Sequence, residues 1–156
     1  MASIFTRIIN REIPAHIVAE DDRFIAFLDV MPLVEGHTLV VPKQEVDYIF
    51  DLNADTLGDM MVFAQKVAVA VKKTIPCKRI GVAVIGLEVP HAHVHLVPMN
   101  SMGDINFMRP KLSPSKEELE KAKRQAESFH TGKRLSKIGR PTKKQRRDLD
   151  GLLEGE

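Results

Sequence analysis

Three histidines alternate with apolar residues in the stretch 91–98, which has the sequence His-Ala-His-Val-His-Leu-Val-Pro. Because side chains alternate across an extended strand, these histidines are expected on one face, with neighbouring Cα atoms about 6.5 Å apart. Imidazole is largely neutral near pH 7 and can act as nucleophile, proton donor or metal ligand. Burying three such rings without partners is costly, so the row predicts a functional site. It consists of His91, His93 and His95, with Ala92, Val94 and Leu96 expected to face the core.

A metal site is the main alternative to nucleophilic chemistry for this row. His-x-His on one strand is a known arrangement of zinc ligands, and His37 could supply a further ligand. The single cysteine, Cys77, excludes an internal disulfide and a zinc site built from cysteines. His16 and His130 are isolated in the sequence and are expected to be structural.

The spacing of apolar residues predicts the elements that position the row. A short helix is expected between an N-cap at Ser3 and a stop at Pro14. A long amphipathic helix is expected over about residues 53–73, capped by Asn53 or Asp55. Strands are expected at 17–20, 23–28, 38–41, 80–85 and 91–98.

The composition is that of an ordinary soluble protein with one main core. The chain has 156 residues, of which 44% are hydrophobic and 28% are charged. No apolar run approaches the ~20 residues that a membrane helix needs, and the start MASIFTRIIN lacks the pattern of a signal peptide. We therefore expect no membrane contact and a cytoplasmic location.

Charge divides the chain near residue 110. Residues 1–109 contain ten Lys/Arg and thirteen Asp/Glu, whereas residues 110–156 contain thirteen and eight. We expect a catalytic domain over 1–109, followed over 110–156 by a helix and a flexible basic tail. The helix should begin at Ser113 or Ser115 and end near Phe129, with disorder beyond Gly132. The basic stretch 133–147 could contact RNA or act only as a solubilising extension.

The histidine row and four earlier blocks together resemble the histidine-triad family, most closely its Hint branch. The blocks follow the family in order and spacing over roughly residues 3–98. They are Ser3-Ile4-Phe5 through Ile13-Pro14-Ala15, Glu20-Asp21-Asp22-Arg23, Ala26-Phe27-Leu28-Asp29 and Gly36-His37-Thr38-Leu39-Val40-Val41-Pro42-Lys43. The resemblance implies an α+β fold, with the long helix packed on a five-stranded antiparallel sheet. It also implies a homodimer joined edge to edge through that helix and the strand before it.

The resemblance gives each histidine a role. His93 would attack an α-phosphate, because a neutral imidazole can bond to phosphorus and leave again. A backbone carbonyl near His91 would orient the His93 ring. His95 would contact phosphate oxygens or the leaving group, and His37 would complete the imidazole network behind His91.

The resemblance also implies a nucleotide pocket. Asp29 would accept hydrogen bonds from the ribose hydroxyls. The base would lie among apolar side chains, which are Phe5, Ile8, Phe27, Val30 and Leu39.

Two departures from the family pattern bear on the chemistry. The loop before the triad, 86–90, is short, and Glu88 stands where a hydroxyl residue is usual. A carboxylate there could accept a proton or repel phosphate. Many relatives begin with a Cys-x-x-Cys zinc pair, but Ser3 and Thr6 occupy those positions, so no structural zinc and no cofactor are expected.

The predicted reaction is hydrolysis of a purine nucleoside phosphoramidate, derived from AMP or GMP, through a nucleotidyl-His93 intermediate. A dinucleoside polyphosphate is the alternative substrate. A different alternative is a nucleotide-binding adaptor that contacts RNA through the basic tail.

Overall fold

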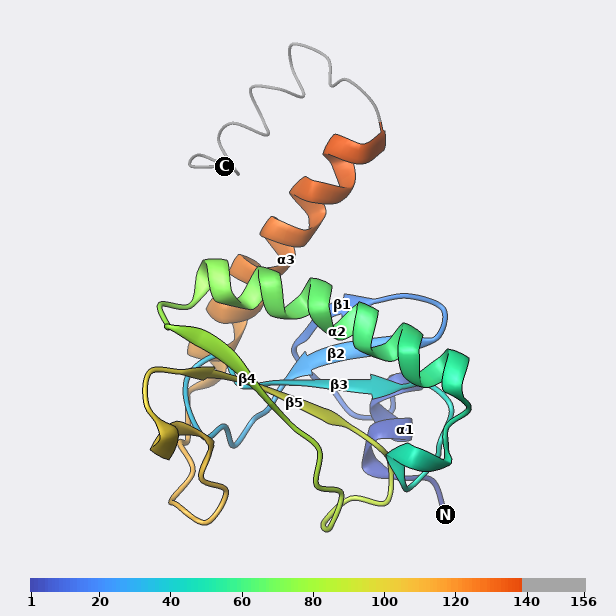
Figure 1. Ribbon diagram of the computed structural model, residues 1–156. Coiled ribbons are helices and arrows are strands. Elements are labelled where there is room, and N and C mark those ends of the chain that lie inside the picture. Colours follow the sequence, from blue (N-terminus) through green and yellow to red (C-terminus); the bar gives the residue numbers. More distant parts are fainter. Residues whose placement is uncertain (139–156) are drawn as a thin grey trace.

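The structure is a computed structural model and describes residues 1–138. Its centre is one antiparallel sheet of five strands in the order β1-β2-β3-β5-β4 (Figure 1). The strands are β1 (Ile17–Glu20), β2 (Phe24–Leu28), β3 (Thr38–Pro42), β4 (Arg79–Ala83) and β5 (Val94–Met99). The α+β fold with a five-stranded antiparallel sheet is therefore confirmed.

The helices also begin where the sequence provides caps. In α1 (Ile4–Ile9) the Ser3 side chain accepts the Thr6 N–H, and in α2 (Ala54–Thr74) Asn53 does the same for Thr56. Two short 3₁₀ turns occupy Ile49–Asp51 and Met102–Ile105. None of the helices within residues 1–138 has the length and apolar character to cross a membrane.

The two faces of the sheet carry separate apolar clusters. Ala26, Leu28 and Val40 pack with α2, which covers one face (Figure 1). The alternating residues Ile25, Phe27, Leu39 and Val41 pack with Phe5 and Ile8 of α1. Every residue of β2 and β3 is buried because both faces are covered.

The third helix, α3 (Lys116–Ile138), extends further than the sequence predicts. Ser115 accepts the Glu118 N–H at its start, and Leu119, Ala122 and Ala126 join the core on the α2 side. The helix continues past its predicted end near Phe129 and past Gly132, as far as Ile138. Most of the basic stretch 133–147 lies outside the described residues.

The position of β3 corrects the expected dimer interface. The strand before the long helix is β3, and it lies between β2 and β5 with both edges hydrogen-bonded. The sheet instead ends at β1 and β4. Near β4 the side chains of Val82, Val84 and Ile85 are exposed, as are Met61 and Val62 on α2. An edge-to-edge dimer would therefore use β4, not β3.

We expect the molar mass in solution to be twice the 17.5 kDa of one chain. Val82 pairs with Leu96 in the register and so faces the α2 side, where a second copy would bury it. Val82→Lys should shift the protein toward the monomer in light scattering, whereas Met108→Lys, at another exposed apolar residue, should not. A wild-type protein that stays monomeric at high concentration would contradict this expectation.

Candidate active site

The ring of His93 is held by the backbone of the residue two positions earlier. His93 Nδ1 lies 2.7 Å from the His91 carbonyl oxygen, and His93 is only 6% exposed. A carbonyl oxygen can only accept, so Nδ1 carries the proton. A neutral ring held in this way has its lone pair on Nε2, so Nε2 is the nitrogen left available to a substrate.

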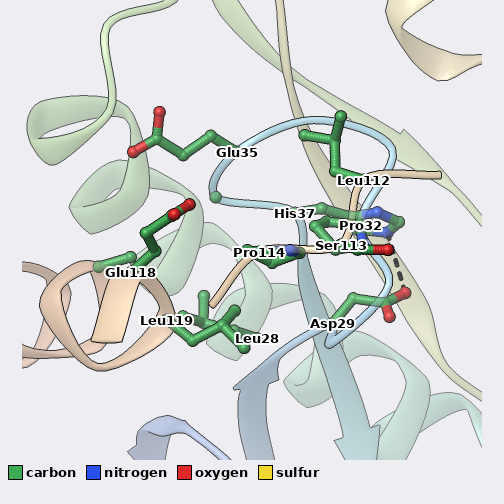
Figure 2. A pocket seen from close by; sticks show the side chains of 12 residues that line it. Leu28, Asp29, Pro32, Glu35, His37, Leu112, Ser113, Pro114, Glu118 and Leu119 are labelled. Carbon is green, nitrogen blue, oxygen red and sulfur yellow. Dashed lines mark ion pairs between the residues drawn. The ribbon is translucent and has the colours of Figure 1, made fainter. Parts of the chain in front are cut away.

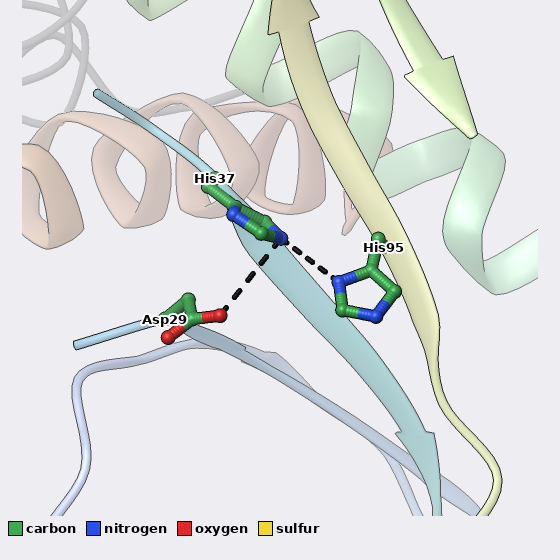
Figure 3. Close-up of side chains that lie close together, drawn as sticks. All are labelled: Asp29, His37 and His95. Atoms are coloured by element: carbon green, nitrogen blue, oxygen red, sulfur yellow. Dashed lines mark hydrogen bonds and ion pairs between the residues drawn. The ribbon is translucent and has the colours of Figure 1, made fainter. Parts of the chain in front are cut away.

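A second pair of rings is fixed in the opposite tautomer. The Leu33 N–H donates to His37 Nδ1 over 3.1 Å, so a neutral His37 carries its proton on Nε2. That Nε2 lies 2.9 Å from His95 Nδ1 and donates to it (Figure 3). A neutral His95 consequently presents an Nε2–H donor.

His91 is the most deeply enclosed member of the row, at 0% exposed. Its Nε2 donates to the Pro42 carbonyl at 2.7 Å, so its Nδ1 accepts from the Ser3 hydroxyl, also at 2.7 Å. Both nitrogens of His91 are thus engaged by hydrogen bonds. This argues against the three histidines of the row acting together as ligands of one metal ion.

Burial keeps the rings of His37, His91 and His95 neutral. It lowers the pKa of His95 to about 3, with the neighbouring histidines and Lys111 acting in the same direction. Burial also lowers the pKa of His37 and of His91, outweighing the nearby carboxylates of Asp29 and Glu45. The site is therefore built from hydrogen-bond donors and acceptors rather than from imidazolium cations.

The sheet places the row differently from the sequence prediction in one respect. The last strand begins at Val94 rather than at residue 91, so His91 and His93 lie in the segment that leads into β5. His95 is on the strand and pairs with Leu39, which in turn pairs with Phe27. The predicted inward alternation is confirmed, since Ala92, Val94 and Leu96 all lie in the core on the α2 side.

His37 has a different partner from the one expected. The resemblance placed it behind His91, but the structure joins it to His95. Phe107, from the segment after β5, packs edge-on against both rings, with centroids 4.7 Å from His95 and 6.3 Å from His37. Sequence reasoning did not single out Phe107, because it lies in an irregular segment without periodicity.

Asp29 lies beside the His37–His95 pair. Its Oδ2 is 3.9 Å from His37 Nε2, and its Oδ1 accepts the Met31 N–H (Figure 3). One potential ligand atom from each of Asp29, His37 and His95 lies within 4.8 Å of the others. His37 Nε2 and His95 Nδ1 are already joined to each other by a hydrogen bond, so these two nitrogens are satisfied without a further partner.

The apolar residues assigned to the base are in two different environments. Phe5, Ile8, Phe27 and Leu39 form one buried cluster on the α1 face of the sheet. Phe5 packs edge-on against His93, with centroids 5.0 Å apart, so this cluster adjoins the His93 ring. Val30 is 56% exposed, and Glu88 is exposed in the loop before the row.

A cavity of about 340 Å³ lies between the loop from Leu28 to His37 and the segment from Leu112 to Ala122 (Figure 2). Asp29 and His37 contribute to its wall. Arg109 and Leu112 fasten the two segments, since Arg109 Nη2 donates to the Leu33 carbonyl and the Leu112 N–H to the Pro32 carbonyl. The chain after β5 thus covers the His37 end of the site.

Comparison with known proteins agrees with this geometry. The HIT domain matches residues 10–102. An uncharacterized HIT-like protein of Borreliella burgdorferi is 33% identical, covering 68% of this chain and 81% of that protein. An adenosine 5'-monophosphoramidase of Saccharomyces cerevisiae is 37% identical, covering 62% of each chain.

A solved structure has the same fold. The crystal structure of a Hit-like protein involved in cell-cycle regulation from Bartonella henselae has a TM-score of 0.70 and is 33% identical. The match covers 81% of this chain and 94% of that one. The fold and the histidine row define a histidine-triad protein, and the chain belongs to the HIT domain family.

The buried neutral histidines predict a dependence of stability on pH. In the unfolded chain their pKa is near 6.5, whereas folding lowers it, so the unfolded state binds more protons below pH ~6.5. The free energy of unfolding should therefore fall as the pH drops from 6.5 to 5, by up to about 1.4 kcal/mol per pH unit for each such histidine. Urea unfolding at both values measures this, and His95→Gln should show a shallower slope. An equal free energy of unfolding at pH 6.5 and pH 5 would mean that these rings take up protons in the folded protein as they do in the unfolded chain.

Proposed function

We propose that this protein is a nucleotide hydrolase that releases a nucleoside 5'-monophosphate from a purine nucleoside phosphoramidate through a nucleotidyl-His93 intermediate. The observation that carries the proposal is the hydrogen bond from His93 Nδ1 to the His91 carbonyl, which leaves the Nε2 lone pair for attack. The similarity to an adenosine 5'-monophosphoramidase supports the choice of an amine as leaving group.

The first step forms a bond between His93 Nε2 and the α-phosphorus. The P–N bond to the leaving amine breaks, and the amine nitrogen takes up a proton from water. The ring gains positive charge as it attacks, and the His91 carbonyl stabilises that charge through the Nδ1–H. The neutral His95 presents its Nε2–H to a phosphoryl oxygen, so it acts as a hydrogen-bond donor.

The second step returns the enzyme to its starting state. Water attacks phosphorus, the bond to Nε2 breaks, and one proton is released to solvent. The products are the nucleoside monophosphate and a neutral His93 in its original tautomer. The His91 carbonyl holds that tautomer throughout, so the ring needs no rotation between turnovers.

The nucleotide would occupy the α1 face of the sheet. Its base would lie against the apolar cluster that includes Phe5 and Leu39, next to His93. Asp29, whose side chain is 20% exposed, would accept the ribose hydroxyls with the lone pairs that Met31 does not use.

A dinucleoside polyphosphate is the second candidate substrate, favoured by one observation. Lys111 lies near His37 and His95, where its positive charge helps to lower the pKa of both rings. Positive charge on this side would favour an anionic leaving group such as a nucleotide. Rates with adenosine phosphoramidates and with diadenosine polyphosphates, compared on the same preparation, separate the two candidates.

His93→Ala should lower turnover of adenosine 5'-phosphoramidate by at least about a thousandfold, because it removes the attacking atom. AMP binding, measured by calorimetry, should weaken far less, since most of the contacts proposed for the nucleotide lie elsewhere. His16→Ala is the matched control, because that histidine pairs with Glu120 on α3 and not with the row. Near-normal turnover in His93→Ala would refute the covalent mechanism.

A further inference from the structure

The N-terminus of α1 is fastened to a carboxylate from the loop after β3. Glu45 Oε1 accepts the backbone N–H of Ser3 at 2.6 Å and the hydroxyl of Thr6 at 2.7 Å. These two donors lower the pKa of Glu45 to about 2, so the carboxylate is charged at any pH where the protein would act. Residues 3 and 6 precede the part of the chain that the HIT domain matches, 10–102.

Ser3 connects this attachment at Glu45 to the histidine row through its hydroxyl. The Ser3 hydroxyl accepts the Thr6 N–H at 3.0 Å and donates to His91 Nδ1 at 2.7 Å. The direction of the second bond is fixed, because the neutral His91 ring carries its proton on Nε2, which donates to the Pro42 carbonyl. Its Nδ1 can therefore only accept. Ser3 is 6% exposed, so water competes little for either bond.

The backbone around His91 is held by the same loop. The His91 side chain donates to the carbonyl of Pro42, and the Ala92 N–H donates to the carbonyl of Val46 at 2.7 Å. Glu45 lies between these two attachment points in the sequence. The side chain of His91 and the peptide bond between His91 and Ala92 are therefore both held by hydrogen bonds to the segment 42–46.

The peptide fixed in this way carries the carbonyl that orients His93. Phe5 of α1 adds a second contact, since its ring packs edge-on against both His91 and His93, with centroids 5.9 and 5.0 Å away. A displacement of α1 would loosen the His91 ring and the wall beside His93 together.

We propose that Glu45 is a positioning residue for the nucleophile, which acts through Ser3 to hold the His91 ring and thereby the carbonyl that orients His93. The proposal rests on the proposed function, because it assigns Glu45 a part in placing His93 Nε2 for attack. It predicts that kcat depends on this cluster while KM does not, since the contacts proposed for the nucleotide include neither Glu45 nor Ser3.

The test compares variants at residues 3 and 45 with adenosine 5'-phosphoramidate as substrate. Ser3→Gly removes the hydroxyl but costs α1 little as an N-cap, so kcat should fall by about tenfold or more with KM within about twofold. Ser3→Thr keeps a hydroxyl and should retain most of kcat. The kcat of Glu45→Ala should fall as much as that of Ser3→Gly. Glu45→Gln retains an acceptor oxygen, so its kcat should fall less.

Glu20→Gln is the matched control, because Glu20 is also a hydrogen-bonded carboxylate with a lowered pKa but pairs with the side chains of Lys43 and Arg11 rather than with Ser3, Thr6 or a histidine. Its kcat should equal that of the wild type. Wild-type kcat in both Ser3→Gly and Glu45→Ala would overturn the proposal. Losses that follow the melting temperature and are not rescued by Ser3→Thr would also overturn it, because they would show a merely structural role.

Nitrogen-15 spectra of the imidazole rings give a second readout that needs no turnover. Ser3→Gly and Glu45→Ala should shift the His91 Nδ1 signal and weaken the protected Nδ1–H of His93, whereas Glu20→Gln should change neither. Unchanged spectra in both variants would overturn the positioning role. If the wild-type protein is inactive but its variants still show these spectral changes, the proposed function is refuted and the positioning role of Glu45 is not.

Discussion

The hydrogen bond from His93 Nδ1 to the carbonyl of His91 is the interaction on which the rest of the site depends. It joins a side chain to the backbone two residues earlier, so its geometry is set by the backbone that leads into β5. Because a carbonyl cannot donate, the bond fixes one tautomer and places the lone pair on Nε2. Two further rings are likewise held in one tautomer by a backbone group, namely the Pro42 carbonyl for His91 and the Leu33 N–H for His37, and His37 in turn sets the tautomer of His95.

Four buried imidazoles would be costly in an apolar core, and the fold offsets this cost by giving them hydrogen-bond partners. The neutral state of His37, His91 and His95 follows from the same burial, which lowers the pKa of these three rings. Around them the sheet supplies rigidity, since Leu39 of β3 and His95 of β5 are paired within a ladder covered on both faces. The site thus combines a proposed nucleophile, the fixed His93 ring, with a fixed hydrogen-bond donor, His95.

Much of this arrangement could be predicted from the sequence because it depends on local pattern. Alternation in 91–98 is sufficient to place Ala92, Val94 and Leu96 in the core, and residue type alone indicates Ser3 as a cap and Asn53 as one of two candidate caps. Both signals act within a few residues, where strand and helix periodicity apply. The five-stranded antiparallel sheet was implied by the family resemblance rather than by any local pattern.

Contacts between distant segments could not be predicted in this way. The pairing of His37 with His95 spans 58 residues, and the attachment of Ser3 to Glu45 spans 42. No periodicity links such positions, so His37 was assigned to the wrong neighbour and Glu45 was not considered. The interior position of β3 was missed for the same reason, since strand order depends on how the whole chain packs. The extent of α3 was underestimated because the polar sequence after Phe129 lacks the apolar face of a packed helix.

The most direct test of the central claim is to locate the nucleotidyl group on the enzyme during turnover. Protein quenched at alkaline pH in the presence of an adenosine phosphoramidate can be digested and sequenced by mass spectrometry, and phosphorus–nitrogen coupling on labelled protein identifies the attached ring nitrogen. The account predicts a single adduct, on His93, with phosphorus bonded to Nε2. Attachment to Nδ1, or to any residue other than His93, would contradict it.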